Sequence, residues 1–384
     1  MEFLQFTHEE YKQRQHAVSQ SLVKNNLDGL ILFRQESMYY LTGYDTSGYT
    51  MFQGGYIGAD GKTALLTRTA DRLQSRMTSI FDDIRIWIDH EGANPGEDLR
   101  DMLADLGCKG KRLGIEYHAY GLTGLRAKMV DAAMEGFCEL VEATDIVREV
   151  RLIKSPAELD YIRTSGALCD DIFKTSLEKT RPGVPVKHVY GAMMQTLMEG
   201  DGDPTASRWP MGAGSAAAFC RYHTGSEVIG ENDQVLFEPA AAYRHYHTCT
   251  MYNILTGKAG NEHRSMNLAA SDAIDACQEA LRPGITVGEL YDVHLKAVEN
   301  RGHGNAALAA CGYTLGISYP PTWMDWPMLW KGNPQVIEAG MVFFIHIILI
   351  DPENKLSMCI GETAIVTDTA CERVNHIPRE LIMV

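Results

Sequence analysis

The sequence has no apolar run long enough to cross a bilayer. Its most apolar stretch, Met341 to Ile350, is far shorter than a membrane-spanning helix and contains His346, so we expect it to form a buried strand. The N-terminal residues are acidic where a signal peptide would be basic, and no long apolar core follows them. These absences exclude a membrane-embedded protein and favour one that is not secreted.

The nine cysteines include no CxxC pair and are scattered along the chain. This spacing excludes a disulfide framework and a zinc knuckle, and it favours small core residues in a reducing, cytoplasmic compartment. Basic residues are also scarce: 35 Lys and Arg stand against 50 Asp and Glu, which gives a net charge of −15. Because this charge disfavours nucleic acid and anionic membranes as partners, we expect a small molecule or a protein instead.

The length of 384 residues predicts two domains. In the first half, helical patterns alternate with apolar, strand-like runs, which is typical of an α/β unit. Examples of these runs are 28–33, 63–67 and 112–116.

A domain boundary is predicted near residue 150. Ser155 can cap a helix that has Pro156 at its first position and Glu158 three residues after the cap. We therefore expect one domain at 1–150 and a second at 151–384.

The second half contains an internal echo. The phrase Arg-Pro-Gly follows a helical stretch at 181–183 and again at 282–284, and each copy precedes another helical pattern. This suggests a pseudo-repeat of helix, turn, helix and strands. Runs rich in β-forming residues between turn residues are strand candidates: 234–239, 245–255, 341–350 and 359–367.

Four phrases follow one another in an informative order. Ser37-Met-Tyr-Tyr-Leu-Thr-Gly-Tyr is similar to "NxxYLTGY", and the stretch from Arg151 to Leu159 looks like an inter-domain helix start. Glu338 to Ile345 matches "xxGMvfxiEP", and Gly361 to Thr367 matches "iEdtvlVT". Together they resemble the superfamily of methionine aminopeptidase, prolidase and creatinase. The resemblance implies an α+β chain with an N-terminal α/β creatinase-like domain and a C-terminal pita-bread fold, in which pseudo-repeated helices cover a curved antiparallel sheet.

Metal-dependent members of this superfamily hold two cations with two Asp, one His and two Glu, since hard divalent ions need clustered anionic oxygens. Carried over by resemblance, these positions fall on Glu238, Cys249, Tyr313, His346 and Glu362. A phenol, a thiol and an imidazole leave too little negative charge for two such ions, so we expect no metal and no cofactor. Two alternatives stay open: a rival register that puts His303 in place of Tyr313, and a zinc ion on Cys249, His346 and a Glu.

Creatinase, a metal-free member, indicates what such a site can do, because it hydrolyses a C–N bond at a delocalised cationic carbon. The reaction needs a base for water, carboxylates that hold the cation and a proton donor for the departing nitrogen. The resemblance places His223 at a catalytic histidine, and an ordinary pKa of about 6.5 suits that base. Glu238 and Glu362 are expected on neighbouring strands, facing the cleft and holding the cation. His346 would orient a carboxylate or donate the proton.

Four further side chains are expected to contact the substrate: Tyr313, Cys249, Arg221 and Trp326. The spacing of Trp323, Trp326 and Trp330 is typical of one helix face, which leaves plain core packing open beside a cation–π role at the cleft. A structural pairing of the two glutamates with Arg221 or Arg244 also stays open. The group that would hold a substrate carboxylate stays open among Arg208, Arg221, Arg244 and a group of the partner subunit.

The resemblance also bears on assembly. In creatinase-like dimers a loop of the N-terminal domain reaches the partner's active site. By position, Tyr44, Tyr49 and Phe52 would take this role here, which predicts a homodimer.

Among the metal-free relatives, the chain looks most like the hydrolases that open the ring of the compatible solute ectoine. The features that carry this likeness are Gly312 to Trp323, Glu238-Pro-Ala-Ala and Phe344-Ile-His-Ile. The implied small-molecule substrate is ectoine, attacked by water at the carbon between its two nitrogens to give N-acetyl-2,4-diaminobutyrate. Three alternatives stay open: a metal-dependent Xaa-Pro peptidase or aminopeptidase, a creatinase-like amidinohydrolase, and a non-catalytic pseudo-peptidase that binds a partner.

Overall fold

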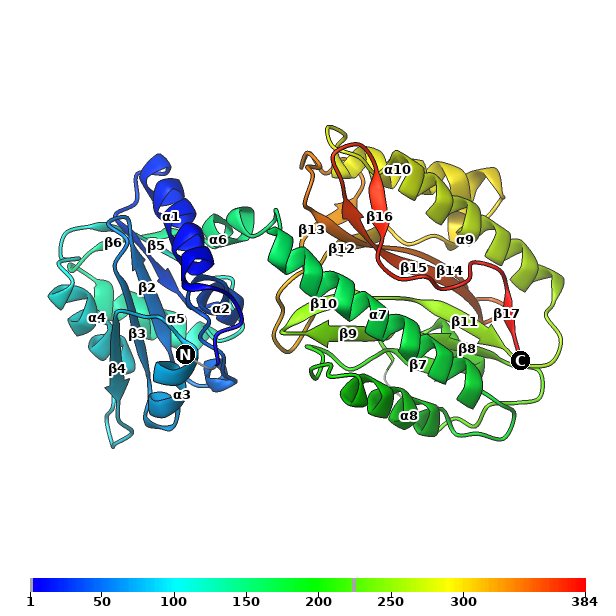
Figure 1. Cartoon of the computed structure of the whole chain (residues 1–384), viewed down its shortest axis with the longest axis horizontal. Coiled ribbons are helices and arrows are strands. Elements are labelled where there is room, and N and C mark those ends of the chain that lie inside the picture. The colour runs from blue at the N-terminus through cyan, green and yellow to red at the C-terminus, as the bar shows by residue number, and fades with distance from the viewer. Residues whose placement is uncertain (1–2, 223–225) are drawn as a thin grey trace. The chain divides into compact units, whose positions relative to one another are not determined.

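A computed structural model describes residues 3–222 and 226–384 of the chain. The chain divides into two compact units, Met1–Arg151 and Leu152–Val384 (Figure 1). Within the described residues, no helix combines the length and the apolar character that crossing a membrane requires.

The first unit is built on a six-stranded sheet in the order β4-β3-β2-β1-β5-β6. Its strands are β1 (Gly29–Leu32), β2 (Gly54–Gly58), β3 (Thr63–Arg68), β4 (Asp83–Trp87), β5 (Arg112–Ile115) and β6 (Glu139–Glu142). Its α-helices are α1 (His8–Lys24), α2 (Gln35–Thr42), α3 (Arg72–Thr78), α4 (Pro95–Asp105), α5 (Gly124–Met134) and α6 (Asp145–Val150). Strand β2 runs antiparallel to β1 and β3, while the other neighbouring pairs are parallel, so this unit is α/β as the sequence predicts.

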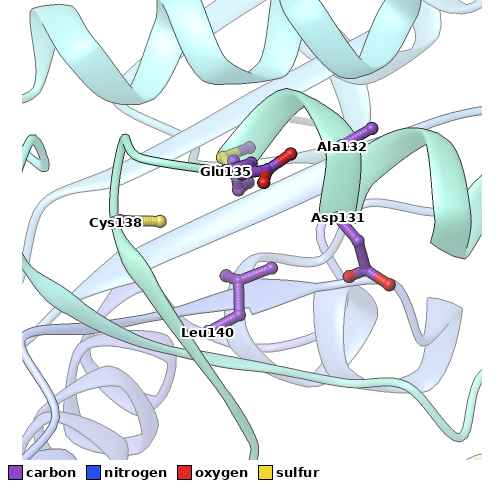
Figure 2. Close-up of a pocket in the computed structure, with 6 residues that line it drawn as sticks. Asp131, Ala132, Glu135, Cys138 and Leu140 are labelled. Atoms are coloured by element: carbon purple, nitrogen blue, oxygen red, sulfur yellow. The ribbon is translucent and has the colours of Figure 1, made fainter.

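An open depression on the first unit lies where α5 ends and β6 begins (Figure 2). Its lining residues are Asp131, Ala132, Met134, Glu135, Cys138 and Leu140. The two acidic side chains are exposed on the surface, and Asp131 accepts a hydrogen bond from Tyr117. None of the residues that the sequence marks for chemistry lines this depression.

The second unit places two helix pairs beside layered strands (Figure 1). The helices are α7 (Pro156–Lys179), α8 (Val186–Glu199), α9 (Asn261–Ala280) and α10 (Val287–Asn300). Helix α7 packs on α8 and helix α9 packs on α10, and each pair is joined by one of the two Arg-Pro-Gly phrases. The internal echo in the sequence is therefore a structural repeat.

The described strands of the second unit form three sheets. A five-stranded sheet has the order β13-β12-β14-β15-β16, a four-stranded sheet has the order β17-β11-β8-β7, and β9 pairs with β10. A backbone bridge between Met251 and Gly361 connects the first two sheets. The strands are β7 (Met211–Ala213), β8 (Gln234–Phe237), β9 (Ala240–Tyr243), β10 (Tyr246–Cys249), β11 (Tyr252–Leu255), β12 (Ala310–Thr314), β13 (Asp325–Trp330), β14 (Val342–Asp351), β15 (Leu356–Val366), β16 (Cys371–Arg373) and β17 (Ile382–Met383).

Local sequence signals explain where the long helices start. The Ser155 side chain accepts a hydrogen bond from the Glu158 N–H, and the Glu158 carboxylate accepts one from the Ser155 N–H, so α7 begins with a complete capping box. Thr286 and Glu289 form the same arrangement at the start of α10. These caps satisfy backbone donors that have no partner inside the helix.

Strand β14 positions the candidate site because its side chains alternate between two environments. Phe343, Ile345 and Ile347 belong to the apolar core that α9 and α10 contribute to. His346 and Ile348 point to the opposite face, where they line a cavity. The buried strand that the sequence predicts is confirmed, with the histidine on its cavity side.

Candidate functional site

A cavity of about 640 Å³ opens in the second unit and is of a size that suits a small molecule. It is walled by β12, β13 and β14, by the residue that follows β8, and by loop segments around 207–210, 220–221 and 321–324. Its polar lining side chains are Ser207, Arg208, Cys220, Arg221, Glu238, Tyr313, Thr322, Trp323 and His346. Six residues that the sequence analysis considers for a role in the cleft line this cavity: Arg208, Arg221, Glu238, Tyr313, Trp323 and His346.

Glu238 is the carboxylic acid of this cavity. It follows directly after β8, is 8% exposed and takes part in a hydrogen bond with Tyr313. The indole N–H of Trp323 donates to the phenol oxygen of Tyr313 at 2.8 Å, so an aromatic chain fixes the orientation of the acid. Burial raises the pKa of Glu238 to about 8, although the positive charge of Arg221 and the Tyr313 hydrogen bond both lower it.

His346 lies beside this chain. Its ring centroid is 5.6 Å from that of Tyr313 and 5.4 Å from that of Phe344, and its Nδ1 has no hydrogen-bond partner among the described residues. Burial lowers the pKa of His346 to about 4, helped by the nearby imidazole of His294 on α10. His346 is therefore a neutral imidazole at pH 7.

His294 is a residue that sequence analysis missed. It is 1% exposed, and neither ring nitrogen has a partner among the described residues. Its only sequence signal is an imidazole on the otherwise apolar face of a helical pattern, which more often indicates plain packing.

Cys249 lies behind the cavity wall. Its thiol is fully buried, and burial raises its pKa well above the ordinary value, with a further rise from the nearby charge of Glu238. The backbone N–H of Cys249 donates to Thr363 Oγ1, and that hydroxyl donates to the Cys249 carbonyl, which ties β10 to β15. A neutral thiol that does not line the cavity cannot contact a ligand directly, so this predicted contact is not supported.

Glu362 does not face the cavity, contrary to the prediction. In the β14–β15 ladder His346 is paired with Gly361, while Glu362 is paired with Ile345. Paired residues of antiparallel strands project to the same face, so Glu362 shares the face of the α9 and α10 core. A slip of one residue in reading the phrase "iEdtvlVT" accounts for the error, because Gly361 takes the position of its glutamate.

The surroundings of both residues agree with this correction. Glu362 is 1% exposed and accepts hydrogen bonds from Gln278, Arg373 and Arg379. A side chain at Gly361 would meet the Phe344 ring and Met251 at under 3 Å, so that face has no room for a carboxylate. Glu362 is therefore part of a buried ionic network under the sheet.

The tryptophans are also placed differently from the prediction. Residues 325–330 form strand β13 rather than a helix, so Trp323, Trp326 and Trp330 do not share one helix face. Trp326 packs against the core beneath α9 and α10, whereas Trp323 lines the cavity. Trp323 replaces Trp326 as the aromatic side chain available to a ligand.

Two arginines line the cavity. Arg208 and Arg221 are exposed, and neither forms an ion pair with an acid among the described residues. Arg244 lies elsewhere, with its guanidinium 4.9 Å from the centroid of the Tyr243 ring and 3.8 Å from Asp201. The predicted base, His223, lies outside the described residues.

His303, the rival to Tyr313, lies away from the cavity at the start of a short 3₁₀ helix (Gly304–Ala306), where it hydrogen-bonds Ser265 at 2.8 Å. In the first unit, Phe52 is 4% exposed and packs in the core at 5.9 Å from Phe33, which contradicts its predicted contact with a partner's substrate. Tyr49, in the short 3₁₀ helix Gly48–Thr50, is 7% exposed and Tyr44 is fully buried, so the structure contradicts the same predicted role for these two side chains.

The donor groups around the cavity do not suit a pair of divalent cations. Across residues 3–222 and 226–384, no three His, Cys, Asp or Glu side chains gather as metal ligands would, which also leaves the zinc alternative without a ligand set. The acid nearest to such a role, Glu238, is instead engaged with the phenol of Tyr313. Neutral thiol and phenol groups are poor ligands for hard cations.

Family comparisons agree with this architecture. The model of metallopeptidase family M24 matches residues 160–368, and the creatinase/prolidase N-terminal domain model matches residues 14–153. The chain belongs to family M24 and has its two-domain, creatinase-like and pita-bread fold. The predicted superfamily and α+β fold class are confirmed.

Individual relatives narrow the class. The chain is 26% identical to the ectoine hydrolase of Halomonas elongata, covering 99% of this chain and 98% of the relative. It is 23% identical to the Xaa-Pro dipeptidase of Pyrococcus furiosus, covering 97% and 100%. The solved dipeptidase PepE of Mycobacterium ulcerans superposes with a TM-score of 0.85 at 20% identity over 99% of both chains, which shows the shared fold. The family and these relatives indicate a hydrolase.

Proposed function

We propose that this hydrolase opens the ring of a cyclic amidine of the ectoine kind by adding water to the carbon between the two nitrogens. The observation that carries the proposal is the buried acid Glu238, held by the Tyr313 and Trp323 chain in a small-molecule cavity that also contains the neutral imidazole of His346. The likeness to the Halomonas elongata ectoine hydrolase along nearly the whole chain supports the same substrate class.

Glu238 binds the substrate cation in this proposal. Its raised pKa means that the acid is largely protonated at pH 7 before binding. An amidinium that enters the cavity favours the ionised form, so the proton leaves and the carboxylate accepts an N–H of the ring. The Trp323 indole offers an aromatic face for the same delocalised cation.

The chemical step adds water to the amidinium carbon and breaks one ring C–N bond. We assign the removal of a proton from water to His223, on the sequence resemblance alone. As the C–N bond breaks, His346 gives a proton from one ring nitrogen to the departing nitrogen and takes the hydroxyl proton of the adduct on its other ring nitrogen, so that the C=O bond forms. The products are a neutral amide and an amine, which becomes an ammonium group when His223 releases the proton that it took from water, so atoms and charge balance.

The direct test is incubation of the purified protein with ectoine, followed by mass spectrometry of the products. We expect a product one water heavier, with the mass of N-acetyl-2,4-diaminobutyrate or its isomer. Parallel incubations with an Xaa-Pro dipeptide and with creatine test the two alternative activities. Hydrolysis of the dipeptide with none of ectoine would reject the proposal.

We also propose that the reaction needs no metal, because the donor groups around Glu238 do not suit divalent cations. We expect less than one transition metal per chain by elemental analysis and unchanged turnover in excess chelator. Two metals per chain, with activity lost in chelator and restored by Mn²⁺ or Co²⁺, would contradict this prediction.

Assembly as a homodimer is proposed on the family resemblance. Sedimentation should give twice the chain mass of 42.7 kDa at assay concentration. An active species of single-chain mass would contradict this prediction. All nine cysteines are free in the structure, which supports the proposal of a reducing, cytoplasmic location.

A further inference from the structure

The charges that line the cavity do not balance. Arg208, Arg221 and Glu238 are the charged groups of the described lining, and the acid is largely protonated at pH 7 because burial raises its pKa to about 8. The cavity is therefore positive in a chain whose net charge is −15. A positive cavity in an acidic protein selects a ligand that carries an anionic group.

The two arginines differ in what they serve. The charge of Arg221 acts on the buried end of the site, because it lowers the pKa values of Glu238 and Tyr313. The pKa of Glu238 responds to the charge of Arg221 and not to that of Arg208. The charge of Arg208 instead lowers the pKa of Tyr190 on α8, which burial raises. Arg208 is thus a lining guanidinium whose charge is not used to support the cavity acid.

The backbone that carries Arg208 is fixed. The next residue, Trp209, is fully buried, and two residues earlier the Ala206 N–H donates to His247 Nε2 at 2.9 Å. The adjacent Ser207 also lines the cavity and adds a hydroxyl. A guanidinium on a fixed backbone is well suited to hold a carboxylate with two parallel hydrogen bonds.

We infer that Arg208 determines specificity by binding the carboxylate of a zwitterionic substrate whose cationic ring lies against Glu238. This inference rests on the proposed function and narrows its substrate class from cyclic amidines to cyclic amidines that carry a carboxylate. An amidine ring without the carboxylate leaves Arg208 unpaired and binds weakly.

The test compares ectoine with the same methylated tetrahydropyrimidine ring lacking its carboxylate. Arg208→Gln should raise KM for ectoine about 10- to 100-fold, the expected loss of a charge-assisted pair, and change kcat little. The same variant should leave KM for the carboxylate-free ring unchanged. Arg208→Lys keeps the charge without the planar fork, so its KM for ectoine should lie between those of the wild type and Arg208→Gln. Arg264→Gln replaces an exposed arginine on α9 outside the cavity, and its KM should match that of the wild type.

Calorimetric binding of both rings separates this inference from the proposed function. If neither ring is hydrolysed but the wild type binds ectoine more tightly and Arg208→Gln removes that preference, the proposed reaction is rejected and the assignment of Arg208 stands. An equal change for both rings, an unchanged KM for ectoine, or a wild type without preference for the carboxylate would overturn it. Because Arg208 is exposed, its replacement should leave the fold intact, and circular dichroism of each variant checks this directly.

Discussion

Glu238→Gln should lower kcat/KM for ectoine by roughly 10²- to 10³-fold while making the protein more stable at alkaline pH. The loss of activity follows because the variant cannot supply the buried charge that holds the amidinium. The gain in stability follows because the fold buries an acid that prefers to be ionised. No other described residue of the cavity combines these two opposite effects.

The sign of the pH effect is fixed by the direction of the pKa shift. The pKa of Glu238 rises from 4.5 to about 8 on folding, so the folded state holds a proton that the unfolded state has lost between these values. Stability therefore falls as pH rises from about 4.5 to about 8, by at most about 5 kcal/mol. Glu238→Gln removes this loss, and its advantage in unfolding free energy should grow over the same range.

Activity of the wild type should change with pH in the opposite direction. Because the cation needs the ionised acid, kcat/KM should rise as pH rises toward about 8, and this limb should be absent in the variant. Denaturant unfolding at several pH values and steady-state kinetics measure the two effects. Glu279→Gln, an exposed acid on α9, is the matched control and should change neither. Unchanged turnover in Glu238→Gln would remove this acid from the site.

Much of the fold could be predicted because its signals are local. The capping pattern at Ser155 and Glu158 specifies the start of α7 whatever lies around it. The run Met341 to Ile350 predicts a buried strand because it is apolar apart from His346, rich in β-forming residues and too short to cross a membrane. The two Arg-Pro-Gly turns are also a local signal of the repeat, because each one follows the end of a helix and precedes the start of the next.

The site could be predicted only in part, because a strand turns a shift of one residue into a change of face. Tyr313, Glu238 and His346 line the cavity, whereas Glu362, which the sequence predicts in the same cleft, lies on the other side of β15. Sequence spacing could not reveal that the arginines which hold Glu362 come from residues 373 and 379.

The prediction that Trp323, Trp326 and Trp330 share one helix face was wrong for a related reason. A three- and four-residue spacing is typical of a helix, but antiparallel pairing with β12 makes β13 a strand. Pairing across the sheet is a long-range property, and a short segment does not specify it by itself. The sequence leaves Arg208, Arg221 and Arg244 open as holders of a substrate carboxylate, and only the cavity lining separates Arg208 and Arg221 from Arg244.

Glu362→Gln should destabilise the fold and leave the folded enzyme active, the reverse of Glu238→Gln. Burial raises the pKa of Glu362 to about 7 while the Arg373 charge and hydrogen bond lower it, and its oxygens lie 2.6 Å from nitrogens of Arg373 and Arg379. Replacing the acid by an amide removes the negative charge that these guanidinium groups share and turns an NH₂ donor toward one of them. Because the pKa is raised on folding, the wild type also loses stability as pH rises from about 4.5 to about 7, so the deficit of the variant should shrink over this range. Arg379 keeps Asp275 as a partner, and Arg373 is partly exposed to water. The free energy of unfolding should therefore fall by about 2–3 kcal/mol, less than the loss expected when a fully buried charge has no partner left.

In a thermal scan this loss corresponds to a midpoint about 5–10 °C lower for a unit of this size. Glu372→Gln is the matched control, because Glu372 pairs with Arg163 at the surface and should cost about 1 kcal/mol or less. The turnover of folded Glu362→Gln should stay within a few-fold of the wild type, since Glu362 faces the α9 and α10 core and not the cavity. A fall in kcat of a hundredfold or more at unchanged stability would instead show that Glu362 acts on the substrate, as the sequence predicts.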